Sequence, residues 1–386
     1  MSEWKEFKLG SGINTNECSV SQEYPHREIL YLDTGSITKG KIDQLQPFSL
    51  SDAPSRAKRL VKHSDIVYST VRPIQRHYGY IKNPTENLVV STGFVVISCS
   101  KKILDPKFTY YYLSSDQVVE ELDIIAEAST STYPSLKPSD IEKFTVRAPI
   151  QIEEQKAIAN VLSSLDDKID LLHRQNKTLE SMAETLFRQW FIEDAHEEWV
   201  ARPLSAIANF LNGLACQKYS PQNGFDKLPV LKIKELSSGI TELSDWATSK
   251  VKSEYIVEFG DIIFAWSASL MVKVWCGERC VLNQHLFKVT SEDLPKWFYL
   301  MWCKHHLAEF ISISSGHATT MGHIKRGDLD AAMVIVPSEH ELKEMTKIMT
   351  PILENQIATA KQIKSLEKLR DTLLPKLMSG EVRVAV

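Results

Sequence analysis

The stretch LKPSDIEKFTVRAP, residues 136–149, has the same pattern as IKRGDLDAAMVIVP, residues 324–337. The residues that match between them are Lys137/Lys325, Asp140/Asp328, Val146/Val334 and Pro149/Pro337. Self-similarity at a long, nearly fixed offset indicates that one structural unit is written twice along a chain. These two stretches therefore predict a duplicated fold.

Four further pairs of stretches match in the same order, which strengthens the repeat: 61–70 with 257–266, 89–98 with 281–290, 111–113 with 298–300, and 179–191 with 366–378. Each half begins with short strand signals separated by Gly, Pro and Asn, and ends in a long helical pattern. We predict an α+β chain with two similar heads and two long helices. The expected boundaries are 1–149 for the first head, 150–199 for the central helix, 200–337 for the second head and 338–386 for the C-terminal helix.

The first helical segment runs from about Gln151 to Trp199 without Pro or Gly. Apolar residues recur at steps of four and three, and Asn176 fills the one polar position of this seam. At 1.5 Å per residue, residues 158–190 would span about 50 Å. The predicted seam residues of this helix are Ile158, Leu162, Leu165, Ile169, Leu172, Leu179, Leu186 and Trp190.

The second helical segment is less regular, and Pro351 is expected to kink or restart it. A narrow stripe of period 3.5 needs a partner helix, so we expect the two segments to pair as an antiparallel coiled coil. The alternative is that each helix packs only on its own head. The predicted interface residues of the second helix are Met349, Ile352, Ile363, Leu366, Leu373 and Leu377.

The net charge of −4 is unevenly distributed. Residues 150–199 carry 5 basic and 11 acidic side chains, whereas residues 45–104 carry 9 basic and 3 acidic ones. A basic surface in the first head is compatible with an acidic total, and such a surface is typical of nucleic-acid binding.

No catalytic motif appears in the sequence. GSITKGKI, residues 35–42, approaches a phosphate-binding loop, but Ile42 stands where Ser or Thr would bind magnesium, so we interpret it as a turn between strands. A zinc set of Cys276, Cys280, His285 and Cys303 would lack the short paired spacing of such sites. We therefore predict no metal site and no catalytic residue, and interpret the six cysteines as free thiols.

Basic, aromatic and hydroxyl residues gather in a few turn-rich stretches, and we predict that they contact DNA phosphates or bases. The alternative is that the basic residues only keep the surface soluble and that the Ser, Thr, Gly and Pro residues only form loops. The candidates of the first head are Lys39, Lys41, Arg56, Lys58, Arg59, Lys62, Arg72, Arg76, His77, Tyr78, Thr130, Tyr133 and Lys137. Those of the second head are Ser267, Ser269, Lys273, His317, Thr319, His323, Lys325 and Arg326. Because the two sets differ, the heads should recognise different sequences.

The chain resembles the specificity subunit of type I restriction–modification systems along essentially its whole length. The residues that carry this resemblance are YLDTGSITKG, PIQIEEQKAIANVLSSLDDKIDLL and LLPKLMSGEVRV. The resemblance implies two target-recognition domains joined by two helices that form an antiparallel coiled coil. It also implies that each domain recognises one half of a split double-stranded DNA site and presents adenine to partner subunits.

The same resemblance implies two methyltransferase subunits that use S-adenosylmethionine, and ATP-dependent restriction subunits that use Mg²⁺. No cofactor is expected on this chain itself. The lack of a run of about 18 apolar residues and of an apolar N-terminal region leads us to expect a cytoplasmic protein without membrane contact. The alternative function is a protein–protein scaffold, with two ligand-binding heads on a coiled coil and no role on DNA.

Overall fold

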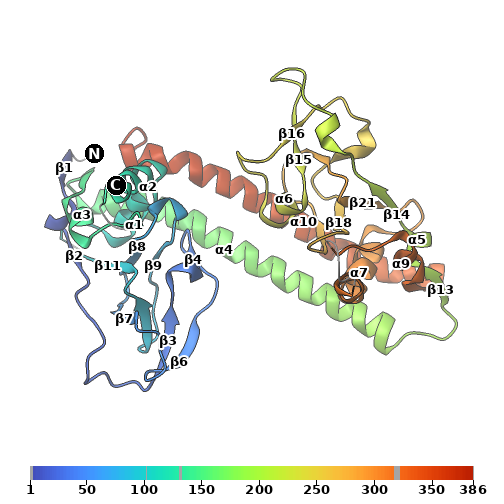
Figure 1. Ribbon diagram of the computed structural model, residues 1–386, viewed down its shortest axis with the longest axis horizontal. Helices are drawn as coiled ribbons and strands as arrows, with labels where there is room; N and C mark the ends of the chain where they lie inside the picture. The colour runs from blue at the N-terminus through green and yellow to red at the C-terminus, as the bar shows by residue number, and fades with distance from the viewer. Residues whose placement is uncertain (1–2, 101, 130–132, 317–321, 386) are drawn as a thin grey trace. The chain divides into compact units, whose positions relative to one another are not determined.

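The computed structural model describes residues 3–100, 102–129, 133–316 and 322–385 (Figure 1). The chain forms two compact units. The first unit consists of Met1–Ile169 with Ser365–Val386, and the second consists of Asp170–Lys364. Each long helix contributes one part to each unit. The N-terminus and the C-terminus therefore both belong to the first unit.

The first unit contains two four-stranded sheets, one two-stranded ribbon and a short hairpin. One sheet has the order β6 (Gln46–Ser49), β3 (Glu28–Leu32), β10 (Leu88–Ser91), β7 (Ala57–Leu60). The other has the order β2 (Ile13–Thr15), β11 (Phe94–Cys99), β8 (Ile66–Ser69), β9 (Tyr78–Tyr80). The ribbon pairs β1 (Trp4–Lys8) with β12 (Thr145–Pro149), and the hairpin pairs β4 (Ile37–Thr38) with β5 (Lys41–Ile42). The short helices of this unit are α1 (Pro106–Ser114), α2 (Asp116–Glu127) and α3 (Pro138–Lys143).

The second unit repeats this topology, which confirms the predicted duplication. One sheet has the order β16 (Trp246–Ala247), β15 (Leu228–Leu231), β20 (Cys280–Leu282), β17 (Ile256–Val257). The other has the order β14 (Asn209–Asn212), β21 (Leu286–Thr290), β18 (Ile262–Ala265), β19 (Met271–Val274). The ribbon pairs β13 (Val200–Pro203) with β22 (Met333–Val336). The short helices are α5 (Leu204–Ile207), α6 (Ile233–Ser238), α7 (Lys296–His305), α8 (Leu307–Ser315) and α9 (Arg326–Ala331).

Strand directions also repeat between the units. In each, one central pair is parallel, β3 with β10 and β15 with β20, and its outer neighbours are antiparallel. The matching stretches 136–149 and 324–337 form α3 with β12 and α9 with β22, respectively. Each of these helices is preceded by a lysine, and the aspartate three residues after that lysine accepts its backbone hydrogen bond. Asp140 accepts from Lys137 N at 2.7 Å, and Asp328 accepts from Lys325 N at 2.6 Å. Such a bond satisfies a backbone donor that the helix itself leaves unpaired.

The two long helices are α4 (Ile152–Arg188) and α10 (Glu339–Ser379). In the first unit the start of α4 and the end of α10 share one core, which contains Ile158, Leu162 and Leu377. In the second unit the end of α4 and the start of α10 share another core, which contains Phe187 and Met349. The helices are therefore antiparallel, and each also packs on the strands and helices of the unit it enters.

The predicted seam residues of both helices point inward. Eight are buried and the rest are half-buried; the buried ones are Ile158, Leu162, Ile169, Leu172, Met349, Ile352, Ile363 and Leu377. Leu165, Leu179, Leu186, Trp190, Leu366 and Leu373 are the half-buried ones. The period of 3.5 thus identified the face of each helix that loses contact with water.

Pro351 does not restart the second helix, so that part of the expectation is wrong; the expected kink stays a prediction. The helix α10 continues through it from Glu339 to Ser379. Proline removes one backbone donor from a helix interior. The neighbouring residues Met349, Ile352 and Leu353 are buried in the core of the second unit, and this packing holds the helical turn in place.

The first long helix ends earlier than its sequence predicts. Regular α-helix stops at Arg188, a π-helical turn covers Gln189–Glu193, and Trp199 lies beyond it. A π turn inserts an extra residue and rotates the side chains that follow. Here it accompanies Phe191, which is 1% exposed and lies 5.6 Å from the rings of both Phe298 and Trp302. Aromatic packing, rather than Pro or Gly, therefore ends the helix.

Among the residues that the structure describes, no helix is long and apolar enough to cross a membrane.

Candidate nucleic-acid interface

Three loops that are far apart in the sequence meet at one place in the first head. They are residues 70–76, 91–93 and 133–137, which we call the first loop cluster. Thr70 N donates to Gly93 O at 2.8 Å, and Leu136 N donates to Thr70 O at 2.8 Å. Because these bonds join backbone to backbone, they fix the loops relative to one another whatever side chains the loops carry.

The second head holds its corresponding loops with the same bonds. Residues 266–270, 283–285 and 322–325 form the second loop cluster. Trp266 N donates to His285 O at 3.4 Å, and Ile324 N donates to Trp266 O at 3.0 Å. Under the sequence repeat, Trp266 takes the place of Thr70, His285 that of Gly93, and Ile324 that of Leu136. The two clusters therefore have one backbone design.

The side chains on this shared backbone differ. The first cluster exposes Arg72, Gln75 and Tyr133, and the Arg72 guanidinium carbon lies 6.0 Å from the centre of the Tyr133 ring. The second cluster exposes His285 beside the half-buried Trp266. Guanidinium, amide and imidazole groups are those that recognise base edges in DNA. The two clusters thus present different side chains, and they do so at different positions of the shared backbone.

The second cluster is tied together by its own polar contacts. Ser267 Oγ lies 3.2 Å from His285 Nδ1, and Gln284 Nε2 lies 3.3 Å from His285 Nε2. The His323 ring meets the Trp266 ring edge-on, with centroids 6.3 Å apart. These contacts hold the imidazole of His285 at the surface in one orientation.

The backbone amides of Lys39 and Gly40 are both hydrogen-bonded within the first head, so neither is available to a phosphate. Both residues have positive φ, +48° and +80°, as expected of a tight hairpin turn. Lys39 N donates to Arg76 O and Gly40 N to Tyr78 O, each at 2.8 Å. The interpretation of GSITKGKI as a turn is confirmed, and the side chains of Lys39 and Lys41 are exposed.

The remaining basic candidates of the first head lie on or near β7. Arg56 and Lys58 are exposed. Lys62 pairs with Glu17 at 2.6 Å, and this hydrogen bond raises the pKa of Lys62. Arg59 turns inward: its Nε is buried without a hydrogen-bond partner among the described residues, and burial lowers the pKa of its guanidinium.

Three predicted contacts of the first head have structural partners instead of a free surface. Arg76 is 20% exposed and pairs with Asp116 at 2.6 Å; burial opposes its charge, but this bond holds the pKa of Arg76 above its usual value. His77 Nδ1 lies 2.6 Å from Ile37 O, which anchors the hairpin. Tyr78 is 4% exposed and donates its hydroxyl to Ser114 O, so it belongs to the core.

The other candidates have mixed positions. Lys137, Ser269, Lys325 and Arg326 are exposed, whereas Ser267 is buried and His323 half-buried. Lys273 lies on β19 and donates to Ser237 O at 3.3 Å. Thr130, His317 and Thr319 lie outside the described residues.

Comparison with known proteins identifies the family of the two heads that carry these clusters. The type I restriction modification DNA specificity domain matches residues 1–181 and again residues 196–368. The chain belongs to this family. Its two matched segments are two specificity domains, each with one loop cluster, and the chain is a specificity subunit of the type I restriction–modification class.

Individual relatives agree with the family. The type I restriction enzyme HindI specificity subunit of Haemophilus influenzae is 23% identical over 99% of this chain and 100% of its own length. The MjaIX specificity subunit of Methanocaldococcus jannaschii is 27% identical over 84% of this chain and 79% of its own. The crystal structure of a type I restriction–modification S subunit from M. genitalium shares the fold, with a TM-score of 0.58 at 15% identity over 97% of this chain and 96% of that one.

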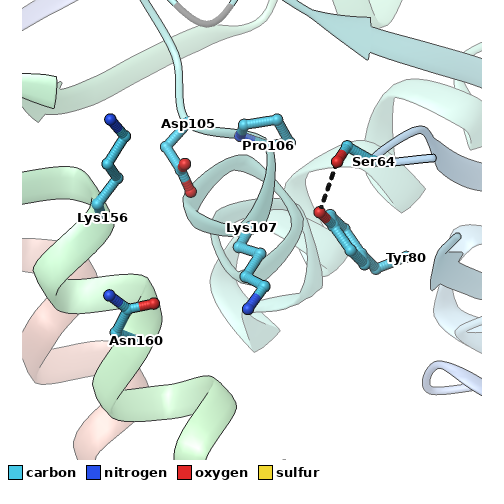
Figure 2. A pocket seen from close by; sticks show the side chains of 7 residues that line it. All are labelled: Ser64, Tyr80, Asp105, Pro106, Lys107, Lys156 and Asn160. Atoms are coloured by element: carbon cyan, nitrogen blue, oxygen red, sulfur yellow. Dashed lines mark hydrogen bonds between the residues drawn. The ribbon is translucent and has the colours of Figure 1, made fainter. Parts of the chain in front are cut away.

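The first specificity domain also contains a polar hollow of about 320 Å³. Figure 2 shows Lys156 and Asn160 of α4 on one side of it, and Asp105 and Lys107 at the start of α1 on another. The Asp105 carboxylate already accepts a hydrogen bond from Phe108 N at 3.0 Å, which caps α1. Within the described part of the chain no three His, Cys, Asp or Glu residues gather so as to hold a metal ion.

Sequence reasoning missed four side chains of the loop clusters: Gln75, Trp266, Gln284 and His285. The signal was present in the repeat itself. Residues 89–98 and 281–290 match in their strand positions, but STG in the first copy stands against NQH in the second. Positions that differ between two copies of one scaffold can determine what each copy binds. These positions carry no Lys or Arg in either copy, so a criterion of basic residues does not find them.

Proposed function

We propose that this chain is the non-catalytic DNA-reading subunit of a type I restriction–modification complex, and that each specificity domain recognises one half of a bipartite DNA site. One observation carries the proposal: the two loop clusters share their backbone hydrogen bonds and differ in their side chains. A duplicated scaffold with distinct exposed polar groups is what recognition of two different half-sites requires.

Exposed cations near the clusters supply the sequence-independent part of binding. Lys39, Lys41 and Lys137 are exposed in the first domain, and Lys325 and Arg326 in the second. Such side chains neutralise DNA phosphates and fix the register of a protein on the duplex. The overall charge of −4 does not oppose this role, because the acidic excess lies in residues 150–199 rather than in the heads.

The chemistry belongs to partner subunits in this proposal. Two modification subunits would bind S-adenosylmethionine and methylate the N6 atom of an adenine in each half-site, and ATP- and Mg²⁺-dependent restriction subunits would complete the enzyme in the cytoplasm. A methyltransferase must take its target base out of the DNA stack, and a subunit that binds both half-sites supports that step. The chain itself would bind no cofactor.

A domain exchange tests the proposal. Residues 200–337 are replaced by the corresponding segment of another specificity subunit, the chimera is co-expressed with the modification subunit, and methylated adenines are mapped across the genome. We expect one half of the methylated motif to change and the other half to stay the same. A change in both halves, or in neither, would contradict modular reading.

A further inference from the structure

One backbone position is strained in the same way in both specificity domains. Arg72 has φ +46° and Ala268 has φ +57°, and these residues are equivalent under the repeat. Their amides make equivalent bonds, Arg72 N to Pro134 O at 3.2 Å and Ala268 N to Gly322 O at 2.8 Å. A left-handed conformation is unfavourable for residues other than glycine and is retained where the surrounding structure imposes it. The scaffold thus fixes this position, while its side chain differs completely.

In the first domain this position begins a rigid, projecting turn. Pro73–Gln75 forms a 3₁₀ turn between Arg72 and Arg76, and both flanking arginines are left-handed. Ile74 N donates to the Asp123 carboxylate at 3.1 Å, and Arg76 pairs with Asp116. These two contacts fix the turn to α2, and the side chains of Arg72 and Gln75 remain exposed. A preorganised turn loses little entropy when it enters a DNA groove.

In the second domain the corresponding loop is short and carries small residues. Ala268 and Ser269 replace the projecting turn, and Leu270 is buried. The larger polar side chains lie instead on the adjacent turn, as Gln284 and His285. The two domains therefore place their long polar side chains on different loops of the same cluster.

The adjacent turn is also built alike in the two domains. In the second, Asn283 is 2% exposed and its side-chain oxygen accepts from His285 N at 3.3 Å. In the first, Ser91 Oγ accepts from Gly93 N at 3.1 Å. Equivalent residues thus close both turns, but the first presents Thr92 and Gly93 where the second presents an amide and an imidazole.

We propose that the two domains read bases with different loops of this shared cluster: the first with Arg72 and Gln75, and the second with Gln284 and His285. The inference rests on the proposed function and names its determinants. Arginine donates two hydrogen bonds to O6 and N7 of guanine, and glutamine pairs with N6 and N7 of adenine. The imidazole of His285 supplies one directional donor or acceptor to a base edge when its Nε2 exchanges the contact with Gln284 for one with the base.

The test maps adenine methylation in cells that express the chain with its modification subunit. The variants are Arg72→Gly, Gln75→Ala and the double variant Gln284→Ala/His285→Ala. Arg72→Gly removes the guanidinium and relieves the left-handed strain, so the variant should fold at least as well as the parent. We expect Arg72→Gly and Gln75→Ala to relax base preference on the order of 10- to 100-fold in one half-site only, and the double variant to do so in the other half only.

Arg147→Ala is the matched control, because Arg147 is an exposed arginine on β12, outside the loop cluster. This variant should methylate the parent motif. If the parent chain directs no bipartite methylation, the proposed function fails. If the parent motif is bipartite but the variants leave every base preference intact, or weaken methylation at all sites equally, the loop assignment is wrong while the proposed function stands.

Discussion

Single carboxylates secure the helix starts of this chain, and Glu341 is the one whose protonation has the clearest consequence. Ser338 Oγ donates to it at 2.5 Å, and Trp199 Nε1 donates at 3.0 Å, so one carboxylate holds both the start of α10 and the segment that follows α4. The bond from Ser338 is the main reason that the pKa of Glu341 lies below its ordinary value of 4.5, although desolvation acts in the opposite direction.

Acidification should therefore loosen this capping arrangement. A carboxyl group whose pKa is lower in the folded state stabilises that state above its unfolded pKa, and this contribution is lost as the pH falls through the folded value. We expect the protection of amides in residues 338–345 against hydrogen exchange, relative to the intrinsic exchange rate at each pH, to fall below about pH 4.5 in the parent chain. Glu341→Gln keeps an acceptor for Trp199 but cannot titrate, so its protection should depend less on pH.

Glu339→Gln serves as the control for this measurement, since Glu339 is an exposed carboxylate on the same helical turn. It should retain the acid response of the parent. If Glu341→Gln responds to acid as strongly as the parent does, the carboxylate of Glu341 is not the group that secures the helix start.

The matched pair Asp140 and Asp328 allows a second test at the level of single residues. Each accepts the backbone hydrogen bond of the lysine that begins its helix, and each lies in a different unit. Replacement by alanine should lower the free energy of unfolding of the affected unit by about 1 kcal/mol. The two effects should add in the double variant, because distant sites are independent. Thermal unfolding would measure this, with Asp293→Ala, an exposed aspartate, as the control.

At the scale of the helices, Asn176 is the polar interruption in an apolar seam. Its Nδ2 donates to Gln356 O at 3.2 Å, while its Oδ1 is buried with no partner among the described residues. A buried asparagine at such a position typically fixes the register of paired helices at the expense of stability. Here one unsatisfied acceptor accounts for the lost stability.

Asn176→Leu should therefore raise the free energy of unfolding of the second unit, by about 1 kcal/mol. Denaturant titration would measure this, and Leu172→Ala, which truncates a buried seam residue, should lower it by about 2–5 kcal/mol. A loss of stability in Asn176→Leu would mean that the bond to Gln356 outweighs the orphaned oxygen.

At the scale of the whole molecule, the sequence predicted the duplication, a block of strands followed by a long helix in each half, and the faces of the long helices. The duplication follows from matching stretches far apart in the chain, and the helix faces follow from local periodicity. The roles of individual basic residues were harder to predict. The sequence around Arg76 does not indicate that Asp116, 40 residues away, is its partner. Tyr78 lies on a short strand whose pattern does not show which of its faces is buried. The loop clusters form only through backbone bonds between distant segments, so their membership needed the fold.

If the proposed function holds, the length of the two long helices should determine the distance between the two DNA half-sites. Asp166 bonds Arg370 in the first unit, and Asn176 bonds Gln356 in the second. Residues 167–173 of α4 and 361–367 of α10 lie between these two bonded pairs along their helices. Removing seven residues from each helix keeps the remaining seam positions of both helices in the same register, because the seam repeats every seven residues. The helices become about 10 Å shorter, which corresponds to roughly three base pairs of DNA.

We therefore expect the doubly shortened chain to methylate the parent half-sites across a gap about three base pairs shorter. Methylation should also be slower, since three base pairs rotate one half-site by roughly a third of a turn about the DNA axis. Removing the heptad from α4 alone should break the pairing of the helices and abolish methylation at both gap lengths. A doubly shortened chain that keeps the parent gap but changes the bases it selects would show that the helices do not set the spacing.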